Sequence, residues 1–391
     1  MAISLYSNAF TIPKTMLIMT GMWPRRDSSR LYRIYGLFNH LLVATFSLSL
    51  CLGTIVAKDF TQFIQGLSMF ISMVNCVIKF AIFDFKHPVF LDLLDFLRTH
   101  HFSYHKDEVD YHLKRIIDFA IVVGKLFLCS CASAIFFMTI IPLFASKGTR
   151  LTPLPFPLDI EKHSFLTYIS VYLYQGLGLA SACCSSIACD NLSTSMMGLC
   201  SAYFAILTDT IILTTNEFQK KTNENHIRSY EKFDEQVYSD LSQCVEHHLA
   251  VIKFTETIED IFSYVFLSQF LCSAFGICVT GFILIKAKPG GFEFMYALLY
   301  LAALMFQITL YCTYGNEITI QSYRVLEACY MTEWVYCGPK VRQNLFLIME
   351  RSKRPVVMTA GKFVTLSLAL LVSVFQSAAS YAMVLYQMYN A

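Results

Sequence analysis

Long apolar stretches without a charged residue alternate with charged stretches along the whole chain. Seven of them contain no Asp, Glu, Lys or Arg. Each is close to the roughly 20 residues that a helix needs to cross the hydrocarbon core of a bilayer. They cover residues 36–57, 60–78, 126–146, 164–189, 261–285, 294–316 and 363–391. The pattern therefore predicts an all-α membrane protein with seven transmembrane helices.

The fourth apolar segment is too long for one crossing. It continues past Asp190 through a second uncharged stretch that ends at Leu207. Because a helix rises only about 1.5 Å per residue, we expect this helix to extend beyond the membrane into water. A carboxylate in lipid is costly, so Asp190 is expected to face protein or water. The sequence does not identify its partner.

Lysine and arginine are distributed unequally between the two sides. With the N-terminus inside, segments 1–35, 84–115, 208–255 and 317–355 hold 21 of the 30 Lys and Arg residues, and the outer segments hold six. The other three, Lys79, Lys125 and Lys362, lie near span ends, where we expect them to snorkel to the interface. The positive-inside rule then predicts a cytoplasmic N-terminus and an extracellular C-terminus, the reverse of G-protein-coupled receptors.

Composition narrows the function. Only 15% of residues are charged and the net charge is +2, so a nucleic-acid partner is not expected. Most of the fourteen cysteines fall in apolar stretches, where free cysteine behaves as a small hydrophobe, and we predict no structural disulfide. The His100, His101 and His105 cluster lacks enough further ligands for a metal site, and ionisable residues do not cluster at membrane depth. We therefore predict no catalytic residues, no metal and no cofactor.

The last charged segment carries apolar residues at helical spacing. They are Leu326, Tyr330 and Trp334, followed after a Cys-Gly-Pro break by Val341, Leu345 and Ile348. The spacing predicts two amphipathic helices joined by a turn. These helices either lie on the membrane surface or pack with the long fourth helix and with neighbouring subunits. Spacing alone does not choose between the two.

One face of the seventh helix carries Ser373, Ser377, Ser380, Val384 and Met388, at spacings of three and four residues. The face is polar in its first part and apolar near the end of the chain. Such a face suits a water-filled path that a hydrophobic constriction closes by dewetting. The alternative is a closely packed helix face, since small residues favour helix contacts in membranes.

Short motifs in the last third of the chain resemble those of the insect odorant receptors. The matching stretches are 315–317, 328–330 with Trp334, 351–355, 360–363, 367–368, 380–381 and 384–385, together with 20–24 near the N-terminus. The resemblance implies a tetrameric cation channel, with a ligand pocket inside each subunit, an intracellular helical anchor and a central pore lined by the seventh helices. By position it implies that Val384 and Met388 form the gate and that Gln387 lines the pore.

The resemblance also divides the chain. It implies a six-helix ligand-binding region over 1–316, anchor helices over 317–355 and a pore helix over 356–391. The family's shared co-receptor carries a long insertion between spans four and five, and segment 208–255 is too short to contain it. We therefore expect an odour-specific subunit that assembles with the co-receptor in the plasma membrane of sensory neurons.

A pocket for a volatile ligand is expected to be mostly aromatic and aliphatic. The candidates in the outer halves of the spans are Phe70, Met73, Phe136, Phe137, Tyr172, Gln175, Gly176, Tyr296 and Tyr300. Any one of them is more often a packing residue than a ligand contact. Two other classes stay open: a gustatory-type channel subunit for a soluble ligand, and a seven-helix transporter or membrane protein without channel activity.

Overall fold

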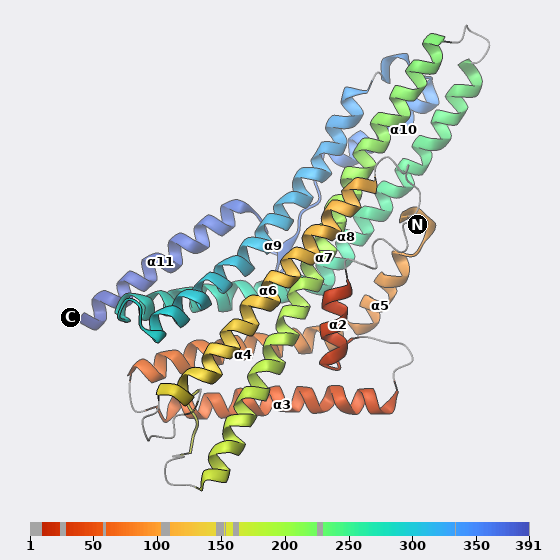
Figure 1. Cartoon of the computed structure of the whole chain (residues 1–391). Helices are drawn as coiled ribbons and strands as arrows, with labels where there is room; N and C mark the ends of the chain where they lie inside the picture. The colour runs from red at the N-terminus through yellow and green to blue at the C-terminus, as the bar shows by residue number, and fades with distance from the viewer. Residues whose placement is uncertain are drawn as a thin grey trace.

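The structure, a computed structural model, is almost entirely helical over the residues it describes (Figure 1). The described residues are 10–23, 29–57, 60–102, 110–145, 152, 154–158, 164–224, 230–332 and 334–390. The α-helices are α2 (Thr11–Met19), α3 (Arg30–Ile55), α4 (Phe60–Phe85), α5 (His87–Phe96), α6 (Asp110–Ala145), α7 (Phe165–Glu224), α8 (Tyr230–Lys286), α9 (Phe292–Met331), α10 (Pro339–Ser352) and α11 (Leu368–Asn390). Short 3-10 helices, η1 (His100–Phe102) and η4 (Trp334–Tyr336), lie between them.

The seven predicted spans fall in α3, α4, α6, α7, α8, α9 and α11, which confirms the all-α membrane fold. Among the described residues, five helices are long and apolar enough to cross a membrane by composition alone: α3, α4, α7, α8 and α9. Local signals set several helix ends. Ser29 caps α3 by accepting a hydrogen bond from the Tyr32 backbone N–H at 3.2 Å. Proline stands in the first turn of α5 and α10, where a missing N–H costs nothing.

Three helices are much longer than a bilayer is thick. Helix α7 has 60 residues, α8 has 57 and α9 has 40. At the standard rise α7 is about 90 Å long, roughly three times the hydrocarbon thickness. The expectation that the fourth span continues beyond the membrane is therefore confirmed. In Figure 1 the last part of α7 and the first part of α8 run side by side near α10.

The region between the sixth and seventh spans differs from the prediction. The sixth span does not end before an anchor helix, because α9 is continuous from Phe292 to Met331. Within it the predicted apolar stripe is not the buried face, since Tyr330 is 65% exposed and Val325 and Cys329 are fully buried instead. The second predicted helix is present as α10, which packs on α8 and α9.

The seventh helix begins later than predicted. A short antiparallel hairpin of β1 (Thr359–Ala360) and β2 (Val364–Thr365) precedes it. Its turn holds Gly361 and Lys362 at φ values of +63° and +68°. The Gly361 N–H donates to the Ser263 carbonyl at 2.9 Å, so the hairpin is fixed to α8. The Leu366 N–H donates to the Met358 carbonyl at 2.9 Å, and the Ser367 hydroxyl accepts from the Leu370 N–H at 3.2 Å. The backbone therefore becomes helical only from Leu368.

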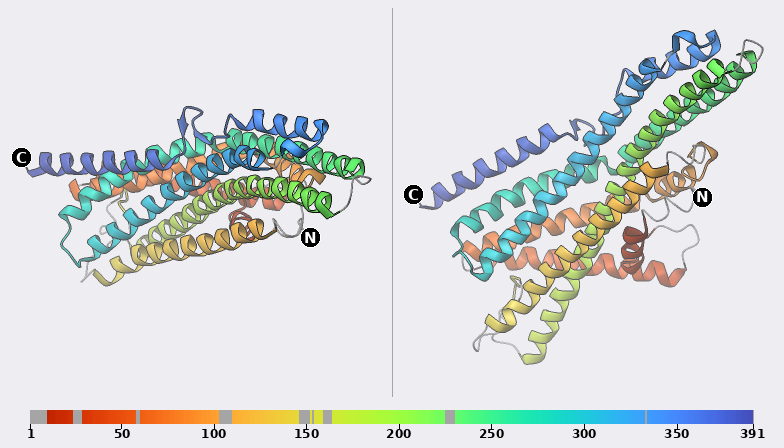
Figure 2. Two further views of the ribbon diagram at one scale, coloured as in Figure 1. Left: turned by 90° about the horizontal axis from the view of Figure 1, so that it is seen from above. Right: turned by 45° about the horizontal axis from the view of Figure 1, so that its top comes forward.

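Helix α7 forms the centre of the bundle and α11 lies at its edge. Every residue from 187 to 207 of α7 is buried, on all sides of the helix. Helices α2, α3, α4, α6, α8 and α9 contact α7. By contrast α11 packs only against α8 and α9 among the elements with substantial contacts, and both views of Figure 2 show it along one side of the molecule.

Candidate functional site: a cavity with a polar floor

A partly open cavity of about 150 Å³ lies among α4, α6, α7, α8 and α9. Its walls are mainly apolar and include Met69, Met73, Phe127, Met138, Leu179, Tyr296, Tyr300 and Leu304. At one end the lining is polar and consists of Asn75, Ser186, Gln269, Ser273 and Gln307, a group that we call the polar floor. A concave apolar site with a few polar groups is the usual form of a small-molecule pocket.

Two tyrosines from α9 form one wall. Tyr296 and Tyr300 stand four residues apart, so they share a helix face, and their rings stack with centroids 6.0 Å apart. The Tyr296 hydroxyl donates to the Met69 sulfur at 3.6 Å, and the Tyr300 hydroxyl shares a hydrogen bond with Ser72. Both phenol groups are therefore bonded to α4, which leaves mainly ring surface for a ligand.

The structure brings three of the nine predicted contact residues to the cavity: Met73, Tyr296 and Tyr300. The lining does not include Phe70, which packs half-buried against the core. Phe136 is 56% exposed. The side chain of Phe137 lies outside the described residues.

The other three predicted contacts lie away from the cavity lining. The Tyr172 hydroxyl donates to the Thr139 carbonyl. The Gln175 amide nitrogen donates to the Leu154 carbonyl at 3.1 Å, so this amide fixes a loop. Gly176 would face only the Thr139 methyl group if it carried a Cβ atom.

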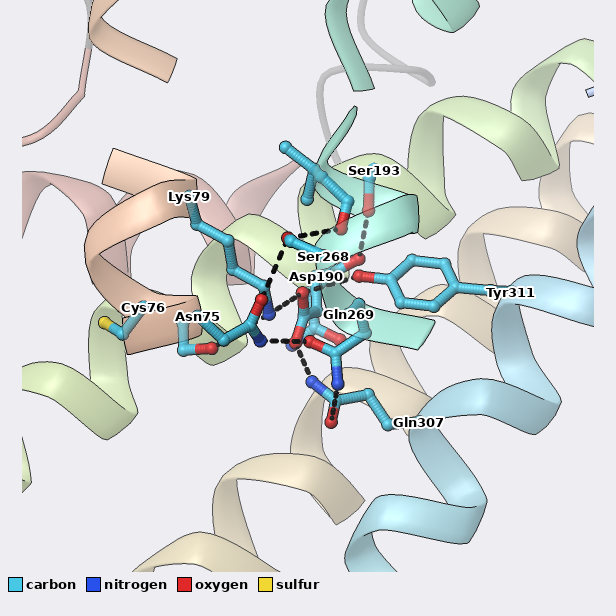
Figure 3. Close-up of polar contacts among 12 residues, drawn as sticks. Asn75, Cys76, Lys79, Asp190, Ser193, Ser268, Gln269, Gln307 and Tyr311 are labelled. Carbon is cyan, nitrogen blue, oxygen red and sulfur yellow. Dashed lines mark hydrogen bonds and ion pairs between the residues drawn. The ribbon is translucent and has the colours of Figure 1, made fainter. Parts of the chain in front are cut away.

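Beneath the polar floor lies a buried ion pair that sequence reasoning did not find (Figure 3). The Lys79 Nζ atom of α4 lies 2.6 Å from Oδ1 of Asp190 on α7. Neither residue is accessible, since Lys79 is 0% and Asp190 4% exposed. Lys79 therefore does not snorkel to an interface, which corrects the prediction. Burying both charges is tolerable because each neutralises the other.

Helix α9 also binds this carboxylate. The Tyr311 hydroxyl donates to Oδ1 of Asp190 at 2.5 Å, and the Gln307 amide nitrogen donates to Oδ2. One carboxylate thus joins three helices, α4, α7 and α9, directly below the cavity. Intramembrane ionisable residues are rare and commonly functional, so the location of this pair next to a cavity favours a functional site.

A chain of amides connects the ion pair to α8 and back to α4. Gln307 accepts a hydrogen bond from the Gln269 amide nitrogen at 2.8 Å, and Gln269 accepts one from the Asn75 amide nitrogen at 2.7 Å. The Ser268 hydroxyl in turn donates to the Asn75 carbonyl oxygen at 2.9 Å. Each of these residues is uncharged and lies inside an apolar span. The available sequence signal was three amide side chains at similar depth in three spans.

The predicted pore face of α11 is exposed in the single chain. Ser373, Ser377, Ser380, Val384 and Gln387 are all exposed, and the Met388 side chain lies outside the described residues. The buried face is a different one, formed by Ala378 and Ala382 against α8. Between α8 and α11 runs an apolar groove lined in part by Phe275, Tyr381 and Val384. The face of α11 that was predicted to line the pore therefore lies on the surface of the single chain.

Comparison with known proteins identifies the family. The model of the 7tm odorant receptor family matches residues 59–379. Odorant receptor 94a of Drosophila melanogaster is 28% identical over 61% of this chain, and odorant receptor 22c of the same species is 24% identical over 95% of it. The matched stretch covers 58% of the first relative and 95% of the second.

A solved structure shares the fold. The insect olfactory receptor OR5 from Machilis hrabei, determined in complex with eugenol, superposes with a TM-score of 0.83 at 17% identity. The alignment covers 99% of each chain. At this identity the likeness establishes the arrangement of helices and nothing finer. Since the family model spans most of the chain and the fold agrees along its whole length, the chain belongs to the insect odorant receptor family.

Proposed function

We propose that this chain is an odour-specific subunit of a heteromeric, odorant-gated, non-selective cation channel in the plasma membrane of sensory neurons. A small volatile molecule binds in the cavity among α4, α6, α7, α8 and α9, and binding opens a central pore lined by α11. The observation that carries the proposal is a largely apolar cavity of about 150 Å³ with a polar floor, in an odorant receptor chain.

Cavity size sets the expected size of the ligand. Apolar cavities of roughly 150 Å³ elsewhere hold a molecule as large as benzene. A compact odorant therefore fits without a large rearrangement, whereas a larger one requires the side chains of the wall to move. The related receptor solved with eugenol supports a small volatile aromatic molecule as a type of ligand for this fold.

A short path leads from the cavity to α11. Helix α9 carries Gln307 at the polar floor and, two turns further on, Gly315. Any Cβ atom at Gly315 would lie 2.4 Å from the Cβ of Leu366, just before α11 begins, so the two backbones are in close contact. A shift of α9 caused by a ligand would therefore be passed directly to the start of α11.

The proposal includes the organisation predicted from the sequence. Residues 1–316 bind the ligand, 317–355 form a cytoplasmic anchor and 356–391 form the pore helix, with the N-terminus in the cytoplasm. Partner subunits, including the co-receptor, would cover the exposed face of α11 that carries Ser377, Ser380, Val384, Gln387 and Met388. Membrane lipid would surround the rest of the spans.

Whole-cell current tests the proposal. Cells express the chain with and without an odorant co-receptor, and a panel of volatile esters, alcohols, ketones and terpenes is applied. We expect an odour-evoked, non-selective cation current that requires both chains. Silence across the panel, with both chains verified at the surface, would contradict it and favour a gustatory-type or non-channel function.

A matched pair of variants then tests the cavity. Ala303 lines the cavity, and its neighbour Ala302 is exposed on the same helix. Ala303→Phe fills the space and is expected to abolish the response, whereas Ala302→Phe adds the same side chain outside it and is expected to preserve the response. Equal responses from the two variants would place the ligand elsewhere.

A further inference from the structure

The Asp190 carboxylate determines which way the amide groups of the polar floor point. An ionised carboxylate only accepts hydrogen bonds, so Gln307 must turn its NH₂ group toward Asp190 and its carbonyl oxygen toward Gln269. Gln269 must then donate to Gln307 and accept from Asn75. The carboxylate thus fixes the orientation of three amides in sequence (Figure 3).

With the amides oriented in this way, the groups that still lack a hydrogen-bond partner are N–H donors and not carbonyl acceptors. An amide nitrogen carries two hydrogens. Within the part of the chain that the structure describes, the nitrogens of Asn75 and Gln307 each donate one hydrogen bond, whereas Gln269 donates two, to Gln307 and Ser273. Both Asn75 and Gln307 line the cavity. One N–H of each amide is therefore left for an occupant of the cavity.

The carbonyl oxygens of the same amides are already engaged. Asn75 accepts from Ser268, and Gln307 accepts from Gln269. A buried N–H without a partner is rarer in proteins, and less well tolerated, than a carbonyl oxygen that uses one of its two lone pairs. An acceptor atom on a ligand therefore gains more at this floor than a donor does.

The cavity also disfavours a charged ligand. The negative charge of Asp190 is matched by Lys79, and the side chains that line the cavity carry no charge. A charged ligand would be buried without a counter-ion, at a large cost in desolvation.

From these observations we infer that the cavity selects small uncharged molecules with a hydrogen-bond acceptor oxygen, such as ketones, aldehydes and esters, and that Gln307 and Asn75 donate to that oxygen. Gln307 is then the specificity-determining residue that joins the ligand to the Lys79–Asp190 pair. The inference rests on the proposed function, because it assumes that the cavity is the odorant site.

Matched ligand pairs test the inference. A ketone and the alkene in which =CH₂ replaces =O have nearly the same shape, as in butanone and 2-methyl-1-butene, cyclohexanone and methylenecyclohexane, and acetophenone and α-methylstyrene. Currents are recorded from cells that express the full chain with the co-receptor, at equal free concentrations. One buried hydrogen bond predicts a half-maximal concentration roughly tenfold lower for the ketone.

Two variants locate the donor. Gln307→Met removes both N–H groups of this amide but leaves that of Asn75, so the ketone's advantage over its matched alkene is expected to shrink. Surface biotinylation verifies that the variant folds and reaches the membrane. In Lys79→Met combined with Asp190→Asn, the new amide no longer fixes the direction of Gln307, and the advantage is expected to shrink.

The outcomes separate the inference from the proposed function. Equal potency of ketone and alkene in the unmodified receptor overturns the inference and leaves an odorant-gated channel standing. An unchanged ketone advantage in Gln307→Met also overturns the role of Gln307. Absence of any current with every pair, with surface expression verified, contradicts the proposed function and the inference with it.

Discussion

Residues 187–207 of α7 and the helix α11 are both apolar segments with many small and hydroxyl side chains, yet they occupy opposite environments. Every residue in the α7 segment is buried, including Asp190 and Asn191. In α11 the described side chains are mostly exposed, and only Ala378 and Ala382 are buried. Two segments that hydropathy does not distinguish are therefore the centre and the margin of the same bundle.

The difference shows what determines which helices pack together in this fold. In lipid, apolar surface gains little from burial against another helix, so polar contacts and close packing decide which helices meet. The α7 segment supplies such a contact through Asp190, which binds Lys79, Gln307 and Tyr311. Helix α11 has no ionisable residue except its three tyrosines, Tyr381, Tyr386 and Tyr389. Its closest approach to α8 among the glycines is at Gly281, where an added Cβ atom would lie 3.2 Å from the Ala382 Cβ. Helix α11 is thus held to the bundle by packing against α8 and α9.

Breaking the buried pair tests this comparison most severely. Lys79→Met or Asp190→Leu alone leaves an unpaired charge in the bundle, which typically costs about 3–5 kcal/mol. We expect each variant to lose most of its surface expression, measured by surface biotinylation and by size-exclusion chromatography of a fluorescent fusion. The double variant, which leaves no buried charge, is expected to recover much of it.

An exposed pair supplies the control. Lys86 and Asp260 also form an ion pair, at 2.7 Å, but their side chains are 33% and 51% exposed. Lys86→Met is expected to have little effect, because exposed pairs contribute at most about 1 kcal/mol. If Lys79→Met and Lys86→Met were equally mild, the pair beneath the cavity would not organise the bundle.

The junction between the two regions gives the next largest effect. Gly315→Ala adds a Cβ atom at 2.4 Å from the Leu366 Cβ, so α9 and the segment before α11 must separate. Overpacking of this kind costs about 1–3 kcal/mol. We expect a lower melting temperature in detergent and a weakened response to odorant.

The same substitution at another helical glycine is the control. Gly176→Ala meets only the Thr139 methyl group, at 4.0 Å, and alanine favours a helix over glycine. Its thermal stability is expected to be unchanged or slightly higher. A similar loss at both positions would mean that flexibility of glycine, rather than the contact with Leu366, is what matters.

The number of spans and the long fourth helix were predictable from the sequence, because they depend on the length of uncharged segments, a local property. The ion pair formed by Lys79 was not predictable in this way. A lysine near a span end either snorkels or pairs, and only the packing of α4 on α7, 111 residues away in the chain, selects the pair.

The candidate site was predictable in part for the same reason. Tyr296, Tyr300 and Met73 follow from apolar character and depth, and they do line the cavity. The polar floor depends on three amides from three helices arriving at one level, which single-sequence spacing does not encode. The hairpin at 359–365 was missed because its apolar residues match a helix start, and its hydrogen bonds to α8 are long-range.

A substitution near the end of α11 is expected to have the smallest effect on folding. Its expected effect on function is confined to the pore. Val384 is 47% exposed on the face predicted to line the pore, and Val372 is 52% exposed at about 120° from it around the helix. If Val384 forms part of a hydrophobic constriction, Val384→Ala widens it and raises basal current a few-fold or changes ion selectivity, with surface expression unchanged. Val372→Ala removes the same methyl groups from another face, so its basal current is expected to match that of the unmodified receptor. If the pore is shared with a co-receptor, as proposed, a partial effect is expected. Normal basal current and selectivity in Val384→Ala would remove this residue from the constriction and favour the alternative in which this face of α11 packs against a neighbouring helix.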